Sequence, residues 1–344
     1  MSNVKPNILL IYTGGTIGMV KDIKTGALHA FNFKNLLKQI PELKLIDCKI
    51  EAMSFENPID SSNMKPEYWI QIANSIELHY NEFDGFVVLH GSDTMSYTAS
   101  ALSFMLENLS KPVIFTGAQL PIGDLRTDAK ENLITSIQIA SLQNEKREPI
   151  IKEVGLYFEY KLYRANRTTK INAENFQAFN SLNYPYLAES GVHLKINHQY
   201  LLKTKPNQPL IVHKKLDNNI ALLKLFPGFA ASHLNSVLKT PNLKAVLLET
   251  YGSGNCTTEK WFLNALKKAI ANGIQIINVT QCVGGGVNMG QYETSSHLKS
   301  IGVISGKDMT TESAITKLMY LLGKSYLEKS LKHEFEIALR GEIT

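Results

Sequence analysis

Short apolar runs alternate along the chain with segments whose apolar residues recur at helical spacing. Continuous apolar runs are typical of strands buried on both faces, and the first half of the chain has four, at residues 7–12, 85–90, 112–116 and 154–158. After Pro66, an amphipathic helix is indicated by the spacing of Trp69, Ile72, Ala73 and Ile76. This alternation of strands and helices predicts a parallel α/β sheet.

The pattern lapses over residues 199–218, where Pro206, Pro209 and several lysines predict a linker. Beyond it, strands are predicted again at residues 220–226, 245–249 and 274–279, with helical stripes at 262–269 and 315–322. The predicted fold class is therefore α/β, with two three-layer α/β domains. We expect a larger N-terminal domain, residues 1–198, with a mostly parallel sheet and most of the active site, and a smaller C-terminal parallel-sheet domain, residues 219–344.

Three further segments complete the predicted order of elements. The polar segment 21–30, which contains Gly26, predicts a loop over the end of the first strand. Residues 33–40 predict a short helix that ends before Pro41. An apolar stripe predicts a helix that runs through Leu102, Met105, Leu106 and Leu109.

The composition is that of an ordinary globular protein, with 344 residues, 44% of them hydrophobic and 19% charged. The net charge of +5 comes from scattered lysines, so no nucleic-acid partner is indicated. Cys48, Cys256 and Cys282 lie far apart, so we expect no metal, no cofactor and a reducing compartment. Neither an apolar signal core nor an apolar run of transmembrane length is present, so we expect a cytoplasmic protein without a membrane partner.

Polar residues follow the predicted strands at three junctions: Thr13-Gly-Gly-Thr16, Asp60-Ser61-Ser62 and Ser92-Asp93. Ligands of open α/β sheets bind beyond the carboxyl ends of the strands, so all three sets are expected at one rim. Each set alone is also compatible with a simple turn or helix cap. A dinucleotide-binding loop is not favoured, because the glycines at 14, 15 and 18 miss its Gly-x-Gly-x-x-Gly spacing.

Acyl transfer through a hydroxyl nucleophile is the chemistry that such a rim could support. A threonine hydroxyl needs a base or a polarising neighbour, and the carbonyl that it attacks needs donors for its developing negative charge. His90 ends a buried apolar strand, which favours a structural histidine. Lys170 is the other basic candidate; burial would lower its pKa and Asp93 would raise it, so its role as a base or as an orienting group stays open.

Five segments together resemble the cytoplasmic type I L-asparaginases of bacteria, over nearly the whole chain. They are Tyr12-Thr-Gly-Gly-Thr-Ile-Gly18, Asp60-Ser-Ser-Asn-Met64, Asp84-Gly-Phe-Val-Val-Leu-His-Gly-Ser-Asp-Thr-Met95, Tyr163-Arg-Ala-Asn-Arg-Thr-Thr-Lys170 and Ser305-Gly-Lys-Asp-Met-Thr310. The resemblance implies two α/β domains, hydrolysis of L-asparagine to L-aspartate and ammonia, and a homotetramer built as a dimer of dimers, or a homodimer.

The resemblance also implies the roles of the candidate residues. Thr16 matches the nucleophile that forms an acyl-enzyme, and Ser92, Asp93 and Lys170 match the second hydroxyl–carboxylate–lysine set. Substrate binding is implied for six residues. Asp60, Ser61 and Ser62 match the residues that hold the α-amino and α-carboxylate groups, and Ala118 matches the segment facing the substrate amide. Ser92 and Asp93 are implied both in the catalytic set and in substrate binding.

The chain departs from the family pattern at three places. Ser92 stands where threonine is usual, which keeps the hydroxyl but loosens its rotamer. The loop after the nucleophile lacks the usual tyrosine, and Tyr292 matches a position where some relatives place a substitute, so we assign it to the catalytic set. Glu249 stands where some regulated relatives have arginine, which predicts against a regulatory asparagine site near Thr169 and Cys282.

Two other functions remain as alternatives. An amidase subunit of a tRNA-dependent amidotransferase would need an added N-terminal domain, whereas this chain starts directly at its first predicted strand. A non-catalytic amino-acid binder with two α/β domains would not need the threonine, serine, aspartate and lysine set. We therefore predict an L-asparaginase.

Overall fold

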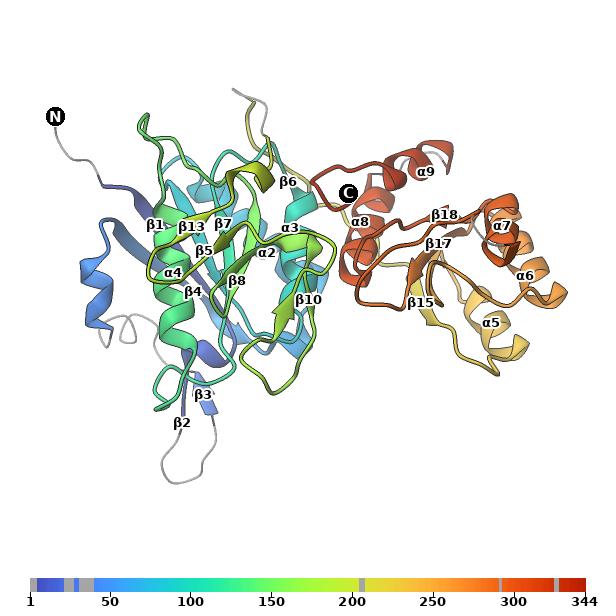
Figure 1. The fold of residues 1–344 in the computed structure, drawn as a ribbon, viewed down its shortest axis with the longest axis horizontal. Coiled ribbons are helices and arrows are strands. Elements are labelled where there is room, and N and C mark those ends of the chain that lie inside the picture. The colour runs from blue at the N-terminus through green and yellow to red at the C-terminus, as the bar shows by residue number, and fades with distance from the viewer. Residues whose placement is uncertain (1–4, 22–27, 31–39, 204–207, 291–292, 325–327) are drawn as a thin grey trace. The chain divides into compact units, whose positions relative to one another are not determined.

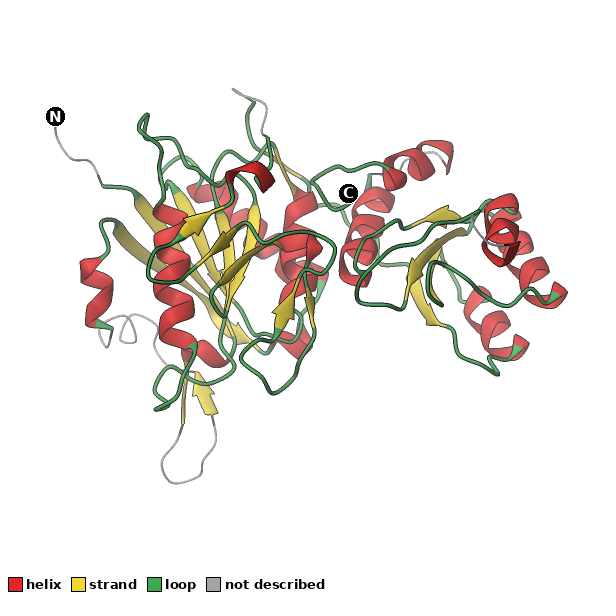
Figure 2. Ribbon diagram, in the orientation of Figure 1, coloured by secondary structure: helices red, strands yellow, loops and turns green. Residues whose placement is uncertain are grey.

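The computed structural model describes residues 5–21, 28–30, 40–203, 208–290, 293–324 and 328–344 (Figure 1). Two compact units divide the chain, Met1–Lys214 and Lys215–Thr344. Helices and strands alternate over residues 49–158 of the first unit and residues 220–323 of the second (Figure 2). Within the described residues, no helix combines the length and the apolar character needed to cross a bilayer.

The first unit is built on an eight-stranded sheet of order β13-β12-β9-β8-β7-β5-β1-β4. Pairing is parallel from β4 to β8 and antiparallel from β8 to β13. The strands are β1 (Asn7–Gly14), β4 (Lys49–Ile59), β5 (Gly85–Leu89), β7 (Val113–Thr116), β8 (Val154–Phe158), β9 (Lys161–Arg164), β12 (Ala188–Glu189) and β13 (Lys195–Ile196). Small two-stranded sheets join β2 (Met19–Lys21) to β3 (Leu28–Ala30), β10 (Thr169–Lys170) to β11 (Phe179–Asn180), and β6 (Leu106–Glu107) to β14 (Ile211–Val212).

Helices cover both faces of this sheet. Helix α4 (Ala129–Ser141) packs its Leu133 and Ile137 into a core with alternate residues of the central strands, such as Leu10 and Val87. Successive residues of a strand point to opposite faces, and the other face is covered by α2 (Pro66–His79) and α3 (Met95–Met105), which contact each other. The result is a three-layer arrangement in which the central strands are buried on both sides.

The second unit has a four-stranded parallel sheet of order β15-β16-β17-β18. Its strands are β15 (Ile220–Lys224), β16 (Ala245–Thr250), β17 (Gln275–Thr280) and β18 (Ile304–Ser305), and its helices are α5 (Ala231–Leu238), α6 (Lys260–Ala271), α7 (Glu293–Ser300), α8 (Thr311–Gly323) and α9 (Glu328–Glu336). Helices α5, α6 and α7 share one apolar core with β16 and β17. The predicted fold class, two α/β domains with a larger mostly parallel sheet and a smaller parallel one, is confirmed.

Several predicted elements are corrected. The helix expected to run through Leu109 ends at Met105, because Leu106–Glu107 pairs with β14 and Asn108 adopts a left-handed φ of 62°. The segment expected as a loop begins and ends in strands, since Met19–Lys21 pairs with Leu28–Ala30. The helix predicted over residues 33–40 lies outside the described residues except for Ile40.

Strand β4, Lys49–Ile59, is absent from the predictions although it pairs along most of β1. Most of its residues are at least partly exposed, as expected for a strand at the edge of the sheet. Because it lacks a continuous apolar run, its sequence gives none of the signal that marks β5 or β8.

Candidate active site

The loops that follow β4, β1 and β5 come together at the carboxyl ends of these three neighbouring parallel strands. A Cβ on Gly15 would lie 2.4 Å from the backbone nitrogen of Gly91, and a Cβ on Gly91 would lie 2.5 Å from the Ser61 Oγ. Gly15 also has a φ of +87°, a conformation that favours glycine. These glycines therefore allow the three predicted polar junctions to pack against one another.

The two threonines of the first junction differ in their surroundings. Thr13 is buried, and its hydroxyl donates a hydrogen bond of 2.9 Å to the carbonyl of Leu89, which ties β1 to β5. Thr16 directly follows the close contact of Gly15 with Gly91 and is partly exposed. Of the two threonines, Thr16 is the one that is partly exposed to solvent.

The second junction, Asp60-Ser61-Ser62, is held in a tight local turn. Asp60 Oδ1 accepts hydrogen bonds from the Ser62 backbone N–H at 2.9 Å and from the Ser62 hydroxyl at 2.8 Å. These two bonds, the backbone one first, hold the pKa of Asp60 below its ordinary value. The Thr94 hydroxyl donates to the Ser61 carbonyl at 2.7 Å and so fixes this turn to the start of α3.

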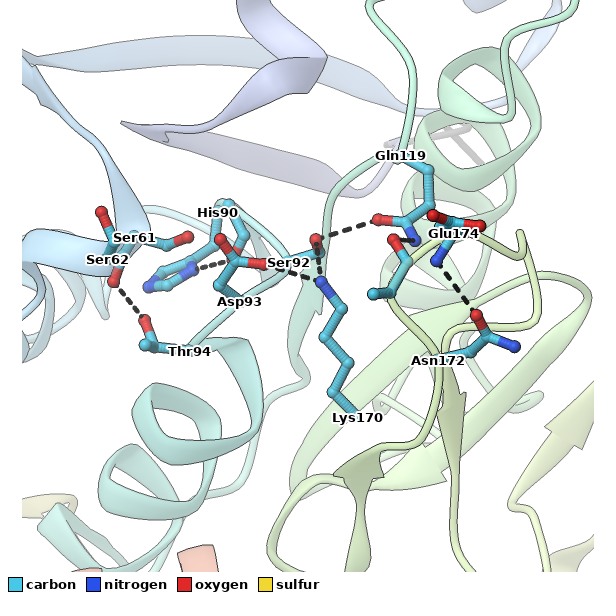
Figure 3. A network of polar contacts seen from close by, with 12 residues as sticks. Ser61, Ser62, His90, Ser92, Asp93, Thr94, Gln119, Lys170, Asn172 and Glu174 are labelled. Atoms are coloured by element: carbon cyan, nitrogen blue, oxygen red, sulfur yellow. Dashed lines mark hydrogen bonds and ion pairs between the residues drawn. The ribbon is translucent and has the colours of Figure 1, made fainter.

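Lys170 contacts both members of the third junction (Figure 3). Its Nζ donates to Ser92 Oγ at 2.9 Å and to Asp93 Oδ1 at 2.7 Å. The lysine side chain is 18% exposed and that of Asp93 is 65% exposed. Strand β10 supplies this lysine from a position 78 residues after Ser92, so only the fold brings the predicted hydroxyl, carboxylate and ammonium together.

His90 lies just before this set but is completely buried. Its Nδ1 donates to the Gly91 carbonyl at 2.7 Å, while its Nε2 has no hydrogen-bond partner among the described residues. Burial lowers the pKa of His90 to about 4, and the bond to Gly91 opposes this only in part. The ring is therefore neutral near pH 7 and shielded from solvent.

A fourth junction, after β7, borders the same set. Ala118 is buried, and the next residue, Gln119, accepts a hydrogen bond of 3.0 Å from the Ser92 hydroxyl (Figure 3). Asp128 accepts the backbone N–H of Gln119 with both oxygens, at 3.1 and 3.0 Å. Asn132 Nδ2 donates to the Gly117 carbonyl at 3.0 Å, so the start of α4 fixes this loop from behind.

The structure thus brings together Ser92, Asp93 and Lys170. Ser61 lies next to this set, because it contacts Gly91 and accepts the hydrogen bond from Thr94. Tyr292 lies outside the described residues. Among the described residues, no group of three or more His, Cys, Asp or Glu side chains could hold a metal ion.

Sequence reasoning missed Gln119 and Asp128. Gln119 directly follows the Gly117-Ala118 pair at a predicted strand end, and Asp128 stands at the helix start, so a search of every such junction for side-chain amides and carboxylates would have found both.

Comparison with known proteins agrees with this architecture. The family model described as "Asparaginase, N-terminal" matches residues 7–202, and that of the "Glutaminase/Asparaginase C-terminal domain" matches residues 219–335. L-asparaginase 1 of Escherichia coli (strain K12) is 42% identical over 345 residues, which cover 99% of this chain and 98% of that protein.

Two further relatives extend the comparison. The 60 kDa lysophospholipase of Mus musculus is 40% identical over 98% of this chain, which covers 62% of that longer protein. The crystal structure of L-asparaginase I from Vibrio cholerae has a TM-score of 0.90 at 38% identity, covering 99% of this chain and 100% of that one. The chain therefore belongs to the asparaginase family of amidohydrolases, as the resemblance of its motifs predicts.

Proposed function

We propose that this protein is an L-asparaginase that hydrolyses L-asparagine to L-aspartate and ammonia through an acyl-enzyme on Thr16. The observation that carries the proposal is the Ser92–Asp93–Lys170 set, joined by hydrogen bonds of 2.9 and 2.7 Å. It lies at the carboxyl ends of the parallel strands, where Thr16 follows β1. A hydroxyl nucleophile needs neighbouring groups that transfer protons, and carboxylate and lysine side chains are among the groups that do so.

The proposed reaction has two halves. In the first, the Thr16 oxygen bonds to the side-chain carboxamide carbon, the C–N bond breaks, and the nitrogen leaves as ammonia after gaining a proton. In the second, a water molecule adds to the resulting ester, the bond to Thr16 breaks, and aspartate leaves with the proton returned to the threonine. Proton transfer in these steps is the role proposed for the Ser92–Asp93–Lys170 set, and Tyr292 is proposed as a further catalytic residue.

Substrate recognition is proposed for the two neighbouring junctions. Asp60 is ionised near pH 7, as an acceptor for the substrate ammonium must be, and its hydrogen bonds from Ser62 lower its pKa further. Ser61, Ser62 and Asp93 would complete the contacts to the α-amino and α-carboxylate groups, and the backbone at Ala118 would face the amide.

The direct test is ammonia release from L-asparagine, D-asparagine and L-glutamine. We expect turnover of L-asparagine by the wild-type protein and a loss of roughly a thousandfold or more in kcat for Thr16→Ala, since the nucleophile acts as a unit with its partners. Thr240→Ala, at an exposed position of the second unit, is the matched control and should keep wild-type kcat. Near-full turnover by folded Thr16→Ala would contradict the assignment.

The same assay separates the alternatives. An amidase subunit that acts only with a partner would release no ammonia from free asparagine, and a binder would form a tight complex without turnover. The cytoplasmic location and the homotetramer or homodimer stay predictions; sedimentation of the purified protein tests the assembly.

A further inference from the structure

Gln119 is bonded at both ends of its carboxamide, and its backbone is fixed as well. Nε2 donates to the carbonyl oxygens of Ala173 and Asn175, each at 3.2 Å, and Oε1 accepts from Ser92 Oγ at 3.0 Å. The backbone N–H is held by the carboxylate of Asp128, which is 7% exposed. The Gln119 side chain therefore links the Ser92–Asp93–Lys170 set to the loop after β10 (Figure 3).

The two carbonyl partners determine which way the amide faces. A backbone carbonyl oxygen only accepts hydrogen bonds, so the NH2 group must face Ala173 and Asn175 and the oxygen must face Ser92. The amide oxygen cannot donate, so the Ser92 hydroxyl must be the donor in its 3.0 Å contact with Gln119.

Lys170 constrains the same hydroxyl from the other side. An ammonium group has three donors and no acceptor, so Ser92 Oγ accepts from Lys170 in their 2.9 Å contact. A hydroxyl has one proton and two lone pairs. With the proton directed at Gln119 and one lone pair at Lys170, what Ser92 has left for a ligand is a lone pair.

We propose that Gln119 is a positioning residue that fixes the direction of the Ser92 proton, so that Ser92 accepts an N–H from a carboxamide and offers no donor to a carboxylate. The inference rests on the proposed function, since asparagine carries the carboxamide and its product, aspartate, carries a carboxylate at the same position. A fixed acceptor favours the substrate over the product, which limits inhibition by aspartate.

Two variants of Gln119 test the amide oxygen that accepts from Ser92 separately from the NH2 group that donates to Ala173 and Asn175. Both variants lose that NH2 group. Gln119→Met has a similar length but also removes the acceptor, which frees the Ser92 proton to turn toward a ligand. Gln119→Glu keeps an acceptor for Ser92 and adds a negative charge, so it reports the loss of the donor without the loss of the acceptor. The side chain borders a cavity of about 420 Å³ lined also by Leu120, Arg126 and Phe176, so both replacements have room. Gln71→Met, on an exposed position of α2, is the control.

The experiment measures aspartate binding by calorimetry, and KM and kcat for L-asparagine, for the wild type and these variants. Gln119→Met should bind aspartate about tenfold more tightly, the effect of one added hydrogen bond to a charged group, and should have a lower kcat. Gln119→Glu should bind aspartate as weakly as the wild type or more weakly, and Gln71→Met should match the wild type. Only Gln119→Met should gain affinity for aspartate, a difference between the two variants that a merely structural role would not produce.

The outcomes distinguish a failure of the proposed function from a failure of the role assigned to Gln119. Wild-type protein that releases no ammonia from asparagine would overturn the proposed function. Active wild type with unchanged aspartate affinity in Gln119→Met would overturn only the role of Gln119. If Gln119→Met does not fold, tighter aspartate binding by Gln119→Glu would contradict the inference, and unchanged or weaker binding would support it.

Discussion

Replacing Lys170 by methionine removes the ammonium that joins Ser92 to Asp93, and it should damage catalysis far more than folding. The variant loses two hydrogen bonds, of 2.9 Å to Ser92 and 2.7 Å to Asp93. Asp93 is 65% exposed, so solvent screens its ion pair, and such pairs contribute about 0–1 kcal/mol to stability. With the Ser92 bond included, we expect the free energy of unfolding to fall by about 1 kcal/mol.

The expected loss of activity is larger because proton transfer depends on the geometry of the whole set. A positioned proton-transfer group contributes roughly 10²–10⁴-fold to a rate, which corresponds to about 3–5 kcal/mol of the activation free energy. We therefore expect kcat of Lys170→Met to fall by about this factor while urea unfolding shows a cooperative transition close to that of the wild type. Steady-state ammonia release and urea titration measure the two effects separately.

Lys214→Met is the matched control for Lys170→Met. Its Nζ lies 2.6 Å from Glu77 Oε2, and the two side chains are 43% and 46% exposed, so it loses an ion pair of the same type. We expect a similar small change in the free energy of unfolding and no change in kcat. If Lys170→Met keeps kcat within about threefold of the wild type, or if both variants lose activity equally, the role assigned to Lys170 is wrong.

Three further predictions concern the surroundings of the site. Gly15→Ala should lose ammonia release and lower the urea midpoint, because its Cβ would meet the Gly91 nitrogen at 2.4 Å and its φ is +87°, a strain of at least about 1–3 kcal/mol; an unchanged midpoint would contradict the close packing of these junctions. The pKa of His90 is about 4 in the folded protein and its ordinary value is 6.5, so the unfolded chain binds the extra proton and stability is lost as pH falls from 6.5 to 4. His90→Gln should lack this loss of roughly 3 kcal/mol in the free energy of unfolding. If that free energy falls equally in both proteins between pH 7 and pH 4.5, the prediction is wrong. Saturation by L-asparagine should be hyperbolic, because Glu249, whose carboxylate accepts a 2.6 Å hydrogen bond from the Thr311 hydroxyl, stands where the family resemblance implies an arginine in some regulated relatives; a sigmoidal curve would contradict this prediction.

Continuous apolar runs made much of the fold predictable. Strands β5 and β8 and helix α2 appear where the patterns of buried residues place them, because burial on both faces or on one stripe leaves a direct trace in the sequence. Strand β4 has an exposed face and left no such trace. The early end of α3 depends on the pairing of Leu106–Glu107 with β14, a segment about a hundred residues later, which no local pattern reveals.

The same division holds for the candidate site. The three polar junctions were predictable because they directly follow strands or precede helices, where ligands of α/β proteins bind. The contact of Lys170 with Ser92 could be expected only from the family resemblance, since 78 residues separate them. The bonds of Gln119 to Ser92, Ala173 and Asn175 depend on side-chain geometry that the sequence does not contain.

The central claim is that the Thr16 oxygen becomes covalently bound to the aspartyl group during turnover. Acid quenching of the protein while it consumes L-asparagine, followed by digestion and mass spectrometry, tests this directly. We predict a mass increase of one aspartyl group on the peptide that contains Thr16, absent from Thr16→Ala treated in the same way. An active wild-type protein that never carries this group, or that carries it on another residue, would contradict the account.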